Sequence, residues 1–535
     1  MATKHQVVIV GGGPVGVGLA VELGLRGIDA VLVERRLTPQ PIPKGQNLAP
    51  RTLEHFWSWG IVDELRAKRI MPPGMPINGI VAYKDLTSDY WYAPPQREIV
   101  QQWYYQKVER LPQYYTEEVL RARMAQCPSI TARFGWAAEK IEQDETGVRV
   151  TIADANGARE TIEGEYVVGC DGGRSKTRAE LGIGGGGDDY DQMMVLAVFR
   201  STELHQRLER FPLRSTYNAL HPDHKGYWQF FGRVEVGKSW FFHAPVPPGT
   251  TADNTDFSAV LHHAAGFPFA IEFDHVGLWD LRVTVADTYR VGRGFIAGDA
   301  AHSHPPYGGY GVNTGLEDAR NLGWKLAAKF QGWGGETLLE SYSAERRPIF
   351  EETGRDFIAG RIEEDRDWLA RHSPDRDKAD FDRAWNERKA LMDTRIQSYE
   401  PHYEGSPVVA GPPGGRTSAH GKHAFAARAG HHLTPRKLSS GKDVFETLGR
   451  DFTLIALGNG LDDDIAMSVR QIESATKTAR VPLKTVRDKY EGEAAQLGAR
   501  LILVRPDHYV AWCRDNSPAD ALALLKRAIG TQSIR

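Results

Sequence analysis

The sequence has few cysteines, no excess of either charge and no long apolar run, and each of these absences excludes a class of protein. Its three cysteines, Cys127, Cys170 and Cys513, lie far apart, which excludes a disulfide framework, a CxxC redox pair and a zinc cluster. The 66 basic and 69 acidic residues give a formal net charge of −3, so no basic field predicts binding to nucleic acid. No stretch approaches the roughly 20 apolar residues of a membrane span. We therefore expect a cytoplasmic protein without a metal site.

The first half of the chain alternates between strand and helix patterns. Residues 4–36 predict a strand, a glycine turn, a helix and a second strand at Ala30–Glu34, which together form a βαβ unit. Residues 130–170 predict several strands. The glycines at 184–187 predict a hinge or the entry to a new domain.

The second half begins β-rich and then becomes helical. Two aromatic runs flank Val236-Gly237-Lys238 and predict a hairpin, which either lines an apolar pocket or forms the core of a sheet. Dense charges at 337–398 predict helices with a solvated face. The run Gly411-Pro412-Pro413-Gly414-Gly415 predicts a linker to a small C-terminal α/β domain.

A glycine motif between the first strand and the first helix predicts a dinucleotide site. Gly11, Gly13 and Gly16 have the GxGxxG spacing, with Pro14 and Val15 between the last two. Such glycines form a tight turn, let the backbone approach a pyrophosphate and allow the helix to pack closely, while the helix N-terminus attracts negative charge. Glu34 ends the next strand, where a carboxylate accepts hydrogen bonds from ribose hydroxyls.

Two further segments each place an acid and a glycine at the end of a strand, which favours FAD over NAD. Asp171 follows Val167-Val168-Gly169-Cys170, and Asp299 follows Phe295-Ile296-Ala297-Gly298. An acid in this position can bind a ribityl hydroxyl. The second segment continues through a glycine-rich loop into an apolar helix, whose exposed N–H groups and dipole favour the negative charge of a reduced flavin.

Taken together, the GxGxxG motif, Asp171-Gly172 and Gly298-Asp299 resemble the class A flavoprotein aromatic hydroxylases, which include p-hydroxybenzoate hydroxylase and phenol hydroxylase. Leu339-Glu340-Ser341-Tyr342 also resembles this family, and the resemblance covers residues 5–400. The tail, with Gly430-His431-His432-Leu433, resembles the thioredoxin-like C-terminal domain of the phenol hydroxylase branch. Because the tail has no CxxC, we expect it to act in dimer packing or stabilisation.

The patterns and the resemblance predict an α/β chain with α+β elements, in which a Rossmann-like FAD-binding domain is interleaved with a β-sheet substrate domain. The predicted parts are an FAD-binding domain with substrate-domain segments near 75–110, a substrate-binding β-sheet domain, the second FAD-binding part with helices, and a thioredoxin-like domain. Their boundaries are 1–183, 184–285, 286–400 and 401–535.

The resemblance also implies a role for individual residues. Gly11, Gly13 and Gly16 would bind the pyrophosphate and Glu34 the adenosine ribose, with Arg35 beside it. Arg51 and Gln113 would reach the pyrophosphate and ribityl region, and Asp299 the ribityl chain. Asp171 would serve FAD and the reduced nicotinamide. The backbone around the isoalloxazine would come from Gly309, Gly311, Val312 and Asn313, and the carbonyl of Pro306 would meet the substrate hydroxyl.

The activity implied is hydroxylation of an aromatic, phenolic substrate by one oxygen atom of O₂, through a flavin C4a-hydroperoxide, with NADH or NADPH as the transient electron donor. The phenol hydroxylase branch has an acid shortly before the arginine that matches Arg51, but Lys44–Pro50 contains none. The catalytic base is therefore open, with His221, His224, His243 and Tyr217 as candidates.

Other functions remain open on the same motifs. One is a different single-component flavin enzyme, such as a halogenase, an epoxidase or a reductase, although the WxWxIP segment of flavin halogenases is missing. Another is a non-catalytic flavin-binding protein, which would bind FAD without turnover. A third, an NAD-only dehydrogenase, would purify without colour.

Overall fold

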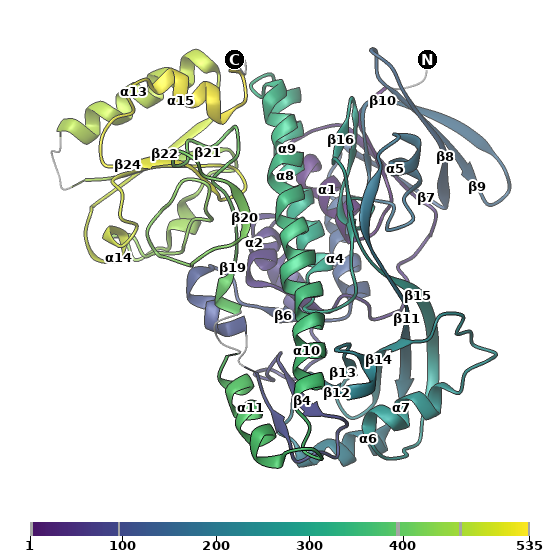
Figure 1. The fold of residues 1–535 in the computed structure, drawn as a ribbon. Helices are drawn as coiled ribbons and strands as arrows, with labels where there is room; N and C mark the ends of the chain where they lie inside the picture. The colour runs from purple at the N-terminus through teal and green to yellow at the C-terminus, as the bar shows by residue number, and fades with distance from the viewer. Residues whose placement is uncertain (1–3, 95–96, 392–395, 459–462, 533–535) are drawn as a thin grey trace.

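The computed structural model describes residues 4–94, 97–391, 396–458 and 463–532. Three larger sheets organise this part of the chain: one at the upper right of Figure 1, one below it and one at the upper left. Helices lie between and around them. The mixed α/β architecture confirms the predicted fold class.

The first sheet contains the predicted βαβ unit. Parallel strands run in the order β17-β10-β1-β2-β7, while β16 pairs antiparallel with β17, and β8 and β9 extend β10. The strands of this sheet are β1 (His5–Val10), β2 (Ala30–Glu34), β7 (Ile130–Phe134), β8 (Trp136–Gln143), β9 (Val148–Asp154), β10 (Arg159–Gly169), β16 (Arg290–Val291) and β17 (Gly294–Ile296).

The register of this sheet explains why three distant motifs meet. Val10 lies opposite Gly169, and Gly169 lies opposite Ile296. Because β1, β10 and β17 are parallel neighbours, their carboxyl ends share one edge of the sheet. The segments that begin at Gly11 and Asp171, and the one that contains Asp299, therefore meet there.

The second sheet has eight strands in the order β18-β15-β11-β14-β13-β12-β4-β5. These are β4 (Gly79–Tyr83), β5 (Trp91–Tyr92), β11 (Gly185–Arg200), β12 (Thr216–Leu220), β13 (Gln229–Glu235), β14 (Ser239–Val246), β15 (Glu272–Ala286) and β18 (His302–Ser303). The predicted hairpin is confirmed as β13 and β14. Of the two alternatives predicted at 184–187, the hinge is wrong, because Gly185–Gly187 begin strand β11, in which Gly187 lies opposite Thr284, while the entry to a new domain stays a prediction. A Cβ on Gly187 would lie 1.9 Å from the carbonyl oxygen of Val283, so the glycine permits a close strand approach.

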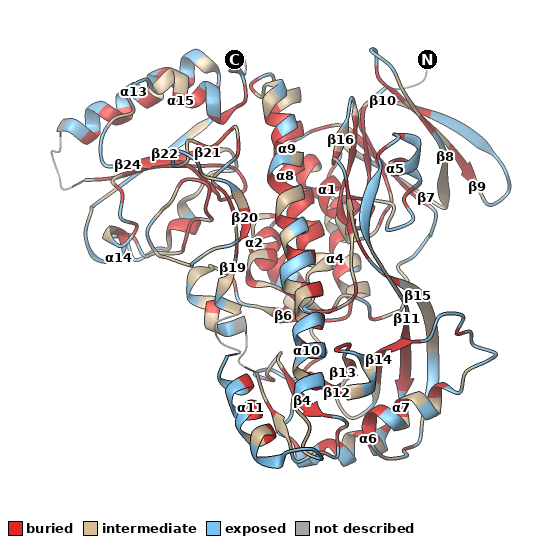
Figure 2. Cartoon of the chain, in the orientation of Figure 1, coloured by how far each residue is buried: buried red, intermediate tan, exposed pale blue. Residues whose placement is uncertain are grey.

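Long helices connect the two sheets. Helix α1 (Pro14–Gly24) packs against α8 (Gly311–Phe330) and α4 (Gln113–Ala125), and α8 packs against α9 (Glu336–Glu352). Helix α9 continues through a π-helical segment, η5 (Thr353–Ala359), into α10 (Gly360–Arg371), and this column crosses the centre of Figure 1. In Figure 2, α8 and α1 are largely buried, whereas α10 carries an exposed face. The predicted charged helices at 337–398 are thus present as α9, α10 and α11 (Lys378–Ala390).

The remaining helices are short or belong to the C-terminal part. They are α2 (Pro50–Ser58), α3 (Val62–Ala67), η1 (Arg97–Trp103), α5 (Lys176–Glu180), α6 (Thr202–Arg207), η2 (Leu208–Arg210), η3 (Pro222–His224), α7 (Phe257–Ala265), η4 (Gly298–Ala300), η6 (Val444–Thr447), α13 (Asp463–Ala479), α14 (Gly492–Ala495) and α15 (Ala521–Ala528). Two small strand pairs complete the set: β3 (Asn47–Leu48) with β6 (Glu109–Arg110), and β19 (Tyr399–Tyr403) with β20 (Thr417–His420).

The C-terminal sheet has the order β22-β21-β23-β24. Its strands are β21 (Phe452–Leu457), β22 (Leu483–Asp488), β23 (Leu501–Val504) and β24 (Val510–Arg514). The predicted linker at 411–415 lies instead in the connection between β19 and β20, whose strands pack on α9. The thioredoxin-like interpretation of this region and the four predicted domain boundaries stay predictions.

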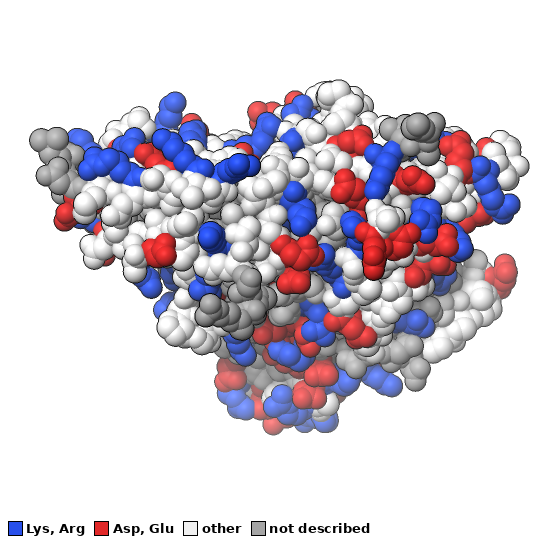
Figure 3. Space-filling view, turned by 90° about the horizontal axis from the view of Figure 1, so that it is seen from above, with Lys and Arg blue, Asp and Glu red and all other residues white. Residues whose placement is uncertain are grey.

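Two surface properties accompany this fold. None of the helices in the described ranges is long and apolar enough to cross a membrane. On the face shown in Figure 3, basic and acidic side chains are interspersed, in keeping with the near-zero net charge of the sequence.

Candidate functional site

A cavity of about 1240 Å³ lies between the carboxyl edge of the first sheet and one face of the second. At one end it is lined by the glycine turn and Asp299, and at the other by His243 and Trp279. Single-ligand pockets are typically about 300–1,000 Å³. The cavity is therefore large enough for a dinucleotide and a second molecule.

The glycine turn at one end is shaped for close approach by a ligand. Gly11 has a φ of 107°, and a Cβ there would lie 2.3 Å from the carbonyl oxygen of Cys170. A Cβ on Gly16 would lie 1.9 Å from the carbonyl oxygen of Gly11, so this glycine lets the helix pack on the turn. A Cβ on Gly13 would meet no protein atom within 4 Å, because Gly13 faces the cavity. Pro14 begins α1, and its helix N-terminus points positive charge at this space.

Glu34 and two cations form the adjoining wall. The Glu34 carboxylate accepts hydrogen bonds from the backbone N–H of Gly12 and of Arg36, both at 2.7 Å, and these fix its orientation. Arg35 and Lys44 also line the cavity. Burial, with the nearby Arg36, lowers the pKa of Lys44, while Glu117 and Asp299 act in the opposite direction. This wall therefore places a carboxylate that can accept hydrogen bonds from ligand hydroxyl groups beside cations that can bind a phosphate.

Asp299 faces the cavity with a carboxylate that makes no hydrogen bond to any described residue. Asp299 is exposed to the space of the cavity, while desolvation by the surrounding walls raises the pKa of its carboxyl, opposed by His302 and Lys44. A partly desolvated carboxylate without hydrogen-bond donors costs free energy. Donors from a ligand, such as the hydroxyl groups of a ribityl chain, would remove that cost.

The loop before α8 forms the floor of the cavity. Gly308 and Gly309 have φ values of 71° and 66°, and Gly309, Gly311 and Val312 line the space. Asn313 does not line it. Its Nδ2 donates to the carbonyl oxygens of Gly309, at 2.6 Å, and Asn47, at 2.9 Å, so it ties the two loops together.

Asp171 and Gln113 both line the cavity while they also brace its walls. The Asp171 carboxylate accepts hydrogen bonds from Ser175 Oγ at 2.5 Å and from the N–H of Thr177 at 2.9 Å, which caps α5. Gln113 Oε1 accepts a hydrogen bond from the N–H of Gly45 at 3.1 Å. Gln113 thus holds the loop that carries Lys44.

The structure does not bring Arg51 to the cavity, although the resemblance places it at the pyrophosphate. Its Nη1 donates to Glu54 at 2.9 Å, and its Nη2 donates to the carbonyl oxygen of Asp507 at 2.5 Å. Its Nε and Nη2 bind Glu317. Glu54 and Glu317 balance the charge of this guanidinium, and Arg51 is not among the residues that line the cavity.

Of the four candidate bases, only His243 lines the cavity. Burial lowers the pKa of His243 to about 3, so its imidazole is neutral at neutral pH and is a weak base. Tyr217 is fully buried, and its hydroxyl accepts a hydrogen bond from Arg233 at 3.0 Å. His221 and His224 lie beside each other outside the cavity. Pro306 lines the cavity, and its carbonyl role stays a prediction.

Arg110 is a cavity residue that the sequence did not single out. It is 3% exposed, its Nη1 donates to Asn47 Oδ1 at 2.7 Å, and its Nη2 donates to the carbonyl oxygen of Arg233 at 3.0 Å. Its Nε is buried without a partner in the described part of the chain. Burial alone lowers its pKa to about 9, since no acid contributes. Arg110 thus places an uncompensated positive charge in the wall.

The residues at the first sheet fit FAD. Gly13 leaves room for a pyrophosphate, Glu34 lies where a ribose is expected, and the Asp299 carboxylate faces the cavity without a hydrogen-bond donor among the described residues. The half of the cavity at the second sheet has an apolar wall with a few polar groups, as small-molecule sites have. Its residues are Phe230, Phe241, Trp279, His243 and Arg110.

Comparison with known proteins agrees with this geometry. Residues 4–355 match the family described as "FAD binding domain", and residues 426–531 match "Aromatic-ring hydroxylase, C-terminal". The 4-methyl-5-nitrocatechol 5-monooxygenase of a Burkholderia sp is 29% identical, over 98% of this chain and 96% of its own length. The rifampicin monooxygenase of Streptomyces venezuelae is 34% identical, over 64% of this chain and 68% of its own.

Solved structures show the same arrangement over nearly the whole chain. A structure of RebC with bound 7-carboxy-K252c superposes with a TM-score of 0.83 and 26% identity, covering 99% of this chain and 100% of RebC. The predicted FAD cofactor and the resemblance to flavoprotein hydroxylases are thereby confirmed. The chain belongs to the family of FAD-dependent monooxygenases that share this FAD binding domain.

Proposed function

We propose that the protein hydroxylates an aromatic small molecule that presents a negatively charged group, a phenolate or a carboxylate, to Arg110. O₂ supplies the oxygen atom, and NADH or NADPH supplies the electrons as a transient co-substrate. The observation that carries the proposal is the buried guanidinium of Arg110 in the cavity wall, for which no acid among the described residues offsets the cost of burial.

An anion beside Arg110 would meet two needs together. It would balance a charge that burial disfavours, and in the dry wall it would form charge-assisted hydrogen bonds. A phenol held there would also lose its proton more easily, because the guanidinium stabilises the phenolate. An ionised phenol is the more reactive nucleophile, so Arg110 would supply part of what a catalytic base supplies elsewhere.

Other wall residues would orient the substrate. Phe230, Phe241 and Trp279 offer flat apolar surfaces, and neutral His243 offers a hydrogen bond without adding charge. Pro306 lines the same space, and we propose that its carbonyl accepts a hydrogen bond from a substrate hydroxyl. Asp356, Phe357 and Ile358, on the π-helical segment, close this end.

The proposed cofactor roles follow the walls of the cavity. Gly11 and Gly13 would bind the pyrophosphate, Glu34 the adenosine ribose and Asp299 the ribityl chain, and the loop at Gly309–Val312 would hold the ring. When bound, FAD accepts hydride and activates O₂. The protein excludes water and fixes the electrostatic field around that chemistry.

One relative supports an acidic aromatic substrate. The Burkholderia sp relative is named for a nitrocatechol, and a nitro group makes a phenol acidic enough to ionise near neutral pH. Another, at 32% identity over 66% of this chain and 64% of its own length, is named a putative polyketide hydroxylase of Streptomyces halstedii, so larger substrates also belong in the test.

The test is stopped-flow reduction of the FAD-loaded protein by NADH and by NADPH, with a panel of nitrophenols, aromatic acids, polycyclic phenols and their methyl ethers or esters. We expect ionisable compounds to accelerate reduction and to emerge hydroxylated, while the capped compounds do not. Reduction that is equal with every compound and yields only hydrogen peroxide would reject the proposal in favour of a reductase or a non-catalytic flavoprotein.

A further inference from the structure

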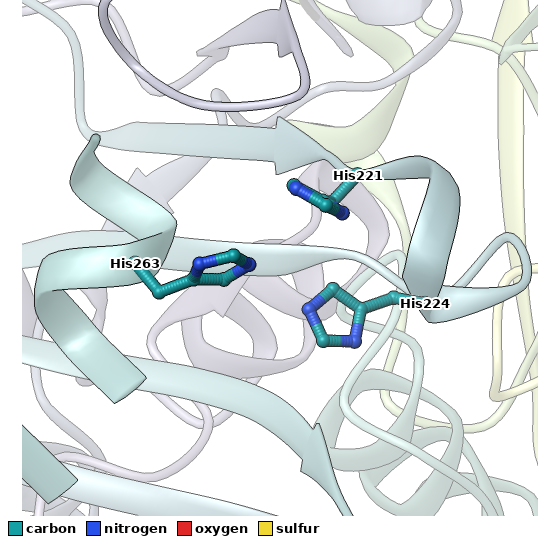
Figure 4. A group of neighbouring side chains, drawn as sticks. All are labelled: His221, His224 and His263. Carbon is teal, nitrogen blue, oxygen red and sulfur yellow. The ribbon is translucent and has the colours of Figure 1, made fainter. Parts of the chain in front are cut away.

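Three histidines from separate elements point their imidazole rings toward one another beside the second sheet (Figure 4). His221 follows strand β12, His224 ends η3, and His263 lies in helix α7. None of them lines the cavity. From this cluster we propose a binding site for a divalent transition-metal ion of the zinc type, coordinated by His221, His224 and His263. The proposal does not depend on the hydroxylase function.

The distances suit a shared ion. One ring nitrogen from each histidine lies within 4.8 Å of the others, and the ring centroids are 4.8, 5.4 and 6.3 Å apart. Zinc binds imidazole nitrogen at about 2.0–2.1 Å, which places two ligands of a tetrahedral ion roughly 3.4 Å apart. Side-chain rotations that bring these nitrogens about 1 Å closer together would close the site around an ion.

One free nitrogen also points to a ligand. His224 Nε2 is buried and has no hydrogen-bond partner in the described ranges, while His263 is exposed on the neighbouring helix α7. The adjacent His262 is paired, since its Nε2 lies 2.9 Å from the carbonyl oxygen of Phe269. A buried polar atom without a partner is costly, and an ion would satisfy His224 Nε2.

His221 is held by a hydrogen bond from the turn that follows it. It is 5% exposed, and its Nδ1 accepts from the N–H of Asp223 at 3.2 Å, with a carboxylate oxygen of the same residue 3.7 Å away. When a histidine binds an ion through one nitrogen, the other commonly carries a proton and donates it to a carboxylate or carbonyl. Binding of an ion through Nε2 would therefore require a proton on Nδ1 and a rotation that exchanges the N–H of Asp223 for its carboxylate.

Imidazole ligands select among ions. Nitrogen donors suit Zn²⁺, Ni²⁺ and Cu²⁺, whereas Mg²⁺ and Ca²⁺ require oxygen ligands. Three protein ligands leave a fourth position for water. An ion here would join α7 to η3. His224, at the end of η3, lies two residues before Gly226, and Gly226 lines the cavity. Gly226 is closely packed, since a Cβ on it would lie 2.1 Å from the carbonyl oxygen of Ile362. We therefore expect the ion to stiffen this end of the cavity wall.

The experiment uses the full-length FAD-loaded enzyme without an affinity tag, stripped with a chelator. Zn²⁺ and, separately, Mg²⁺ are titrated by calorimetry, and bound metal is counted by elemental analysis. We expect one Zn²⁺ per chain, micromolar or tighter, and no binding of Mg²⁺. His224→Gln and His263→Gln should weaken Zn²⁺ binding at least tenfold, while the control His5→Gln, at a histidine paired with Asp29, should bind as the wild type does.

Co²⁺ provides a readout that needs no variant. A tetrahedral site with nitrogen ligands gives Co²⁺ strong visible absorption, measured against the chelated protein as the blank to remove the flavin bands. Wild-type protein that shows neither saturable 1:1 Zn²⁺ binding nor this absorption would overturn the proposal. So would His263→Gln protein that is folded, contains FAD and binds Zn²⁺ as tightly as the wild type.

Discussion

Arg51 donates two hydrogen bonds to the carboxylate of Glu317, from Nε at 3.0 Å and from Nη2 at 3.2 Å. This bidentate pair joins α2 to α8, and Nη2 also reaches the carbonyl oxygen of Asp507 in the C-terminal part. His55 adds a contact of 2.8 Å to the same carboxylate. The arginine that the resemblance assigned to the cofactor therefore holds three parts of the fold together.

Replacement of Arg51 by methionine should loosen the C-terminal sheet while FAD binding remains. Glu317 and Glu54 would stay buried without their shared cation, and removal of one partner of a buried pair costs about 3–5 kcal/mol. We expect faster amide exchange in residues 501–514, measured by hydrogen–deuterium exchange, and an unchanged Kd for FAD. The control is Arg347→Met, whose pair with Glu351 is exposed. A large loss of FAD affinity with unchanged exchange would instead place Arg51 at the cofactor.

Two glycines of the first motif should respond differently to alanine. Gly13 has a φ of −74°, which alanine adopts freely, and its added methyl would enter only the cavity. Gly13→Ala should change the free energy of unfolding of the apoprotein by less than about 1 kcal/mol. It should raise the Kd for FAD at least tenfold. Gly16→Ala should lower the stability of the apoprotein itself, because its methyl would overlap the carbonyl oxygen of Gly11.

Calorimetric unfolding and fluorescence titration with FAD separate these two effects. If Gly13→Ala binds FAD as the wild type does, the pyrophosphate does not lie against this turn, and the proposed position of the cofactor fails.

The first sheet could be predicted from the sequence because its signals are local. A short apolar run that ends in an acid, as at Ala30–Glu34, marks a buried parallel strand, and the glycine motif fixes where the helix starts. The meeting of Gly11, Asp171 and Asp299 also followed, since parallel neighbouring strands bring their carboxyl ends to one edge.

Other features depend on partners far along the chain. Gly187 reads as part of a flexible turn until strand β15, almost a hundred residues later, pairs with it. Arg51 looks like a phosphate ligand, since its partners at Glu317 and Asp507 cannot be read from its neighbours. Arg110 looks like a surface cation, because burial is a property of the fold.

Acid should weaken the contact between α1 and the C-terminal part. Burial tends to raise the pKa of Glu22, but the charges of Arg320 and Arg26 outweigh it and lower the pKa to about 2. Arg26 also binds Asp451 at 2.9 Å. Because the folded pKa lies below the unfolded one, the pair stabilises the fold above about pH 4.5, and that stability is lost as pH falls toward 2.

Thermal unfolding of the wild type and Glu22→Gln from pH 7 to pH 3 tests this dependence. The variant should be several degrees less stable at pH 7, and the gap should narrow steadily below pH 4.5. A gap of constant size across the range would mean that Glu22 contributes packing and not charge.

Arg110→Met should make the enzyme more stable and a weaker binder of its substrate. Burial lowers the pKa of Arg110 to about 9, so the guanidinium is still charged at neutral pH and its burial opposes folding. Methionine removes that penalty and fills much of the same volume, which should raise the melting temperature of the substrate-free enzyme. An anionic ligand would lose charge-assisted hydrogen bonds of about 1.5–3 kcal/mol, or roughly 10–100-fold in Kd.

Two ligands that differ only in whether they can ionise isolate the effect of the ligand's charge on binding. The Kd of an ionised nitrophenol or aromatic acid should rise in Arg110→Met, while the Kd of its methyl ether or ester should stay within about twofold, and Arg110→Lys should recover part of the loss. FAD content and the slow oxidation of NAD(P)H without substrate should not change. If the Kd of both ligands rises equally, Arg110 acts only through the shape of the cavity wall. If FAD binds more weakly and the ratio of the two Kd values is unchanged, the anionic partner of Arg110 belongs to the cofactor.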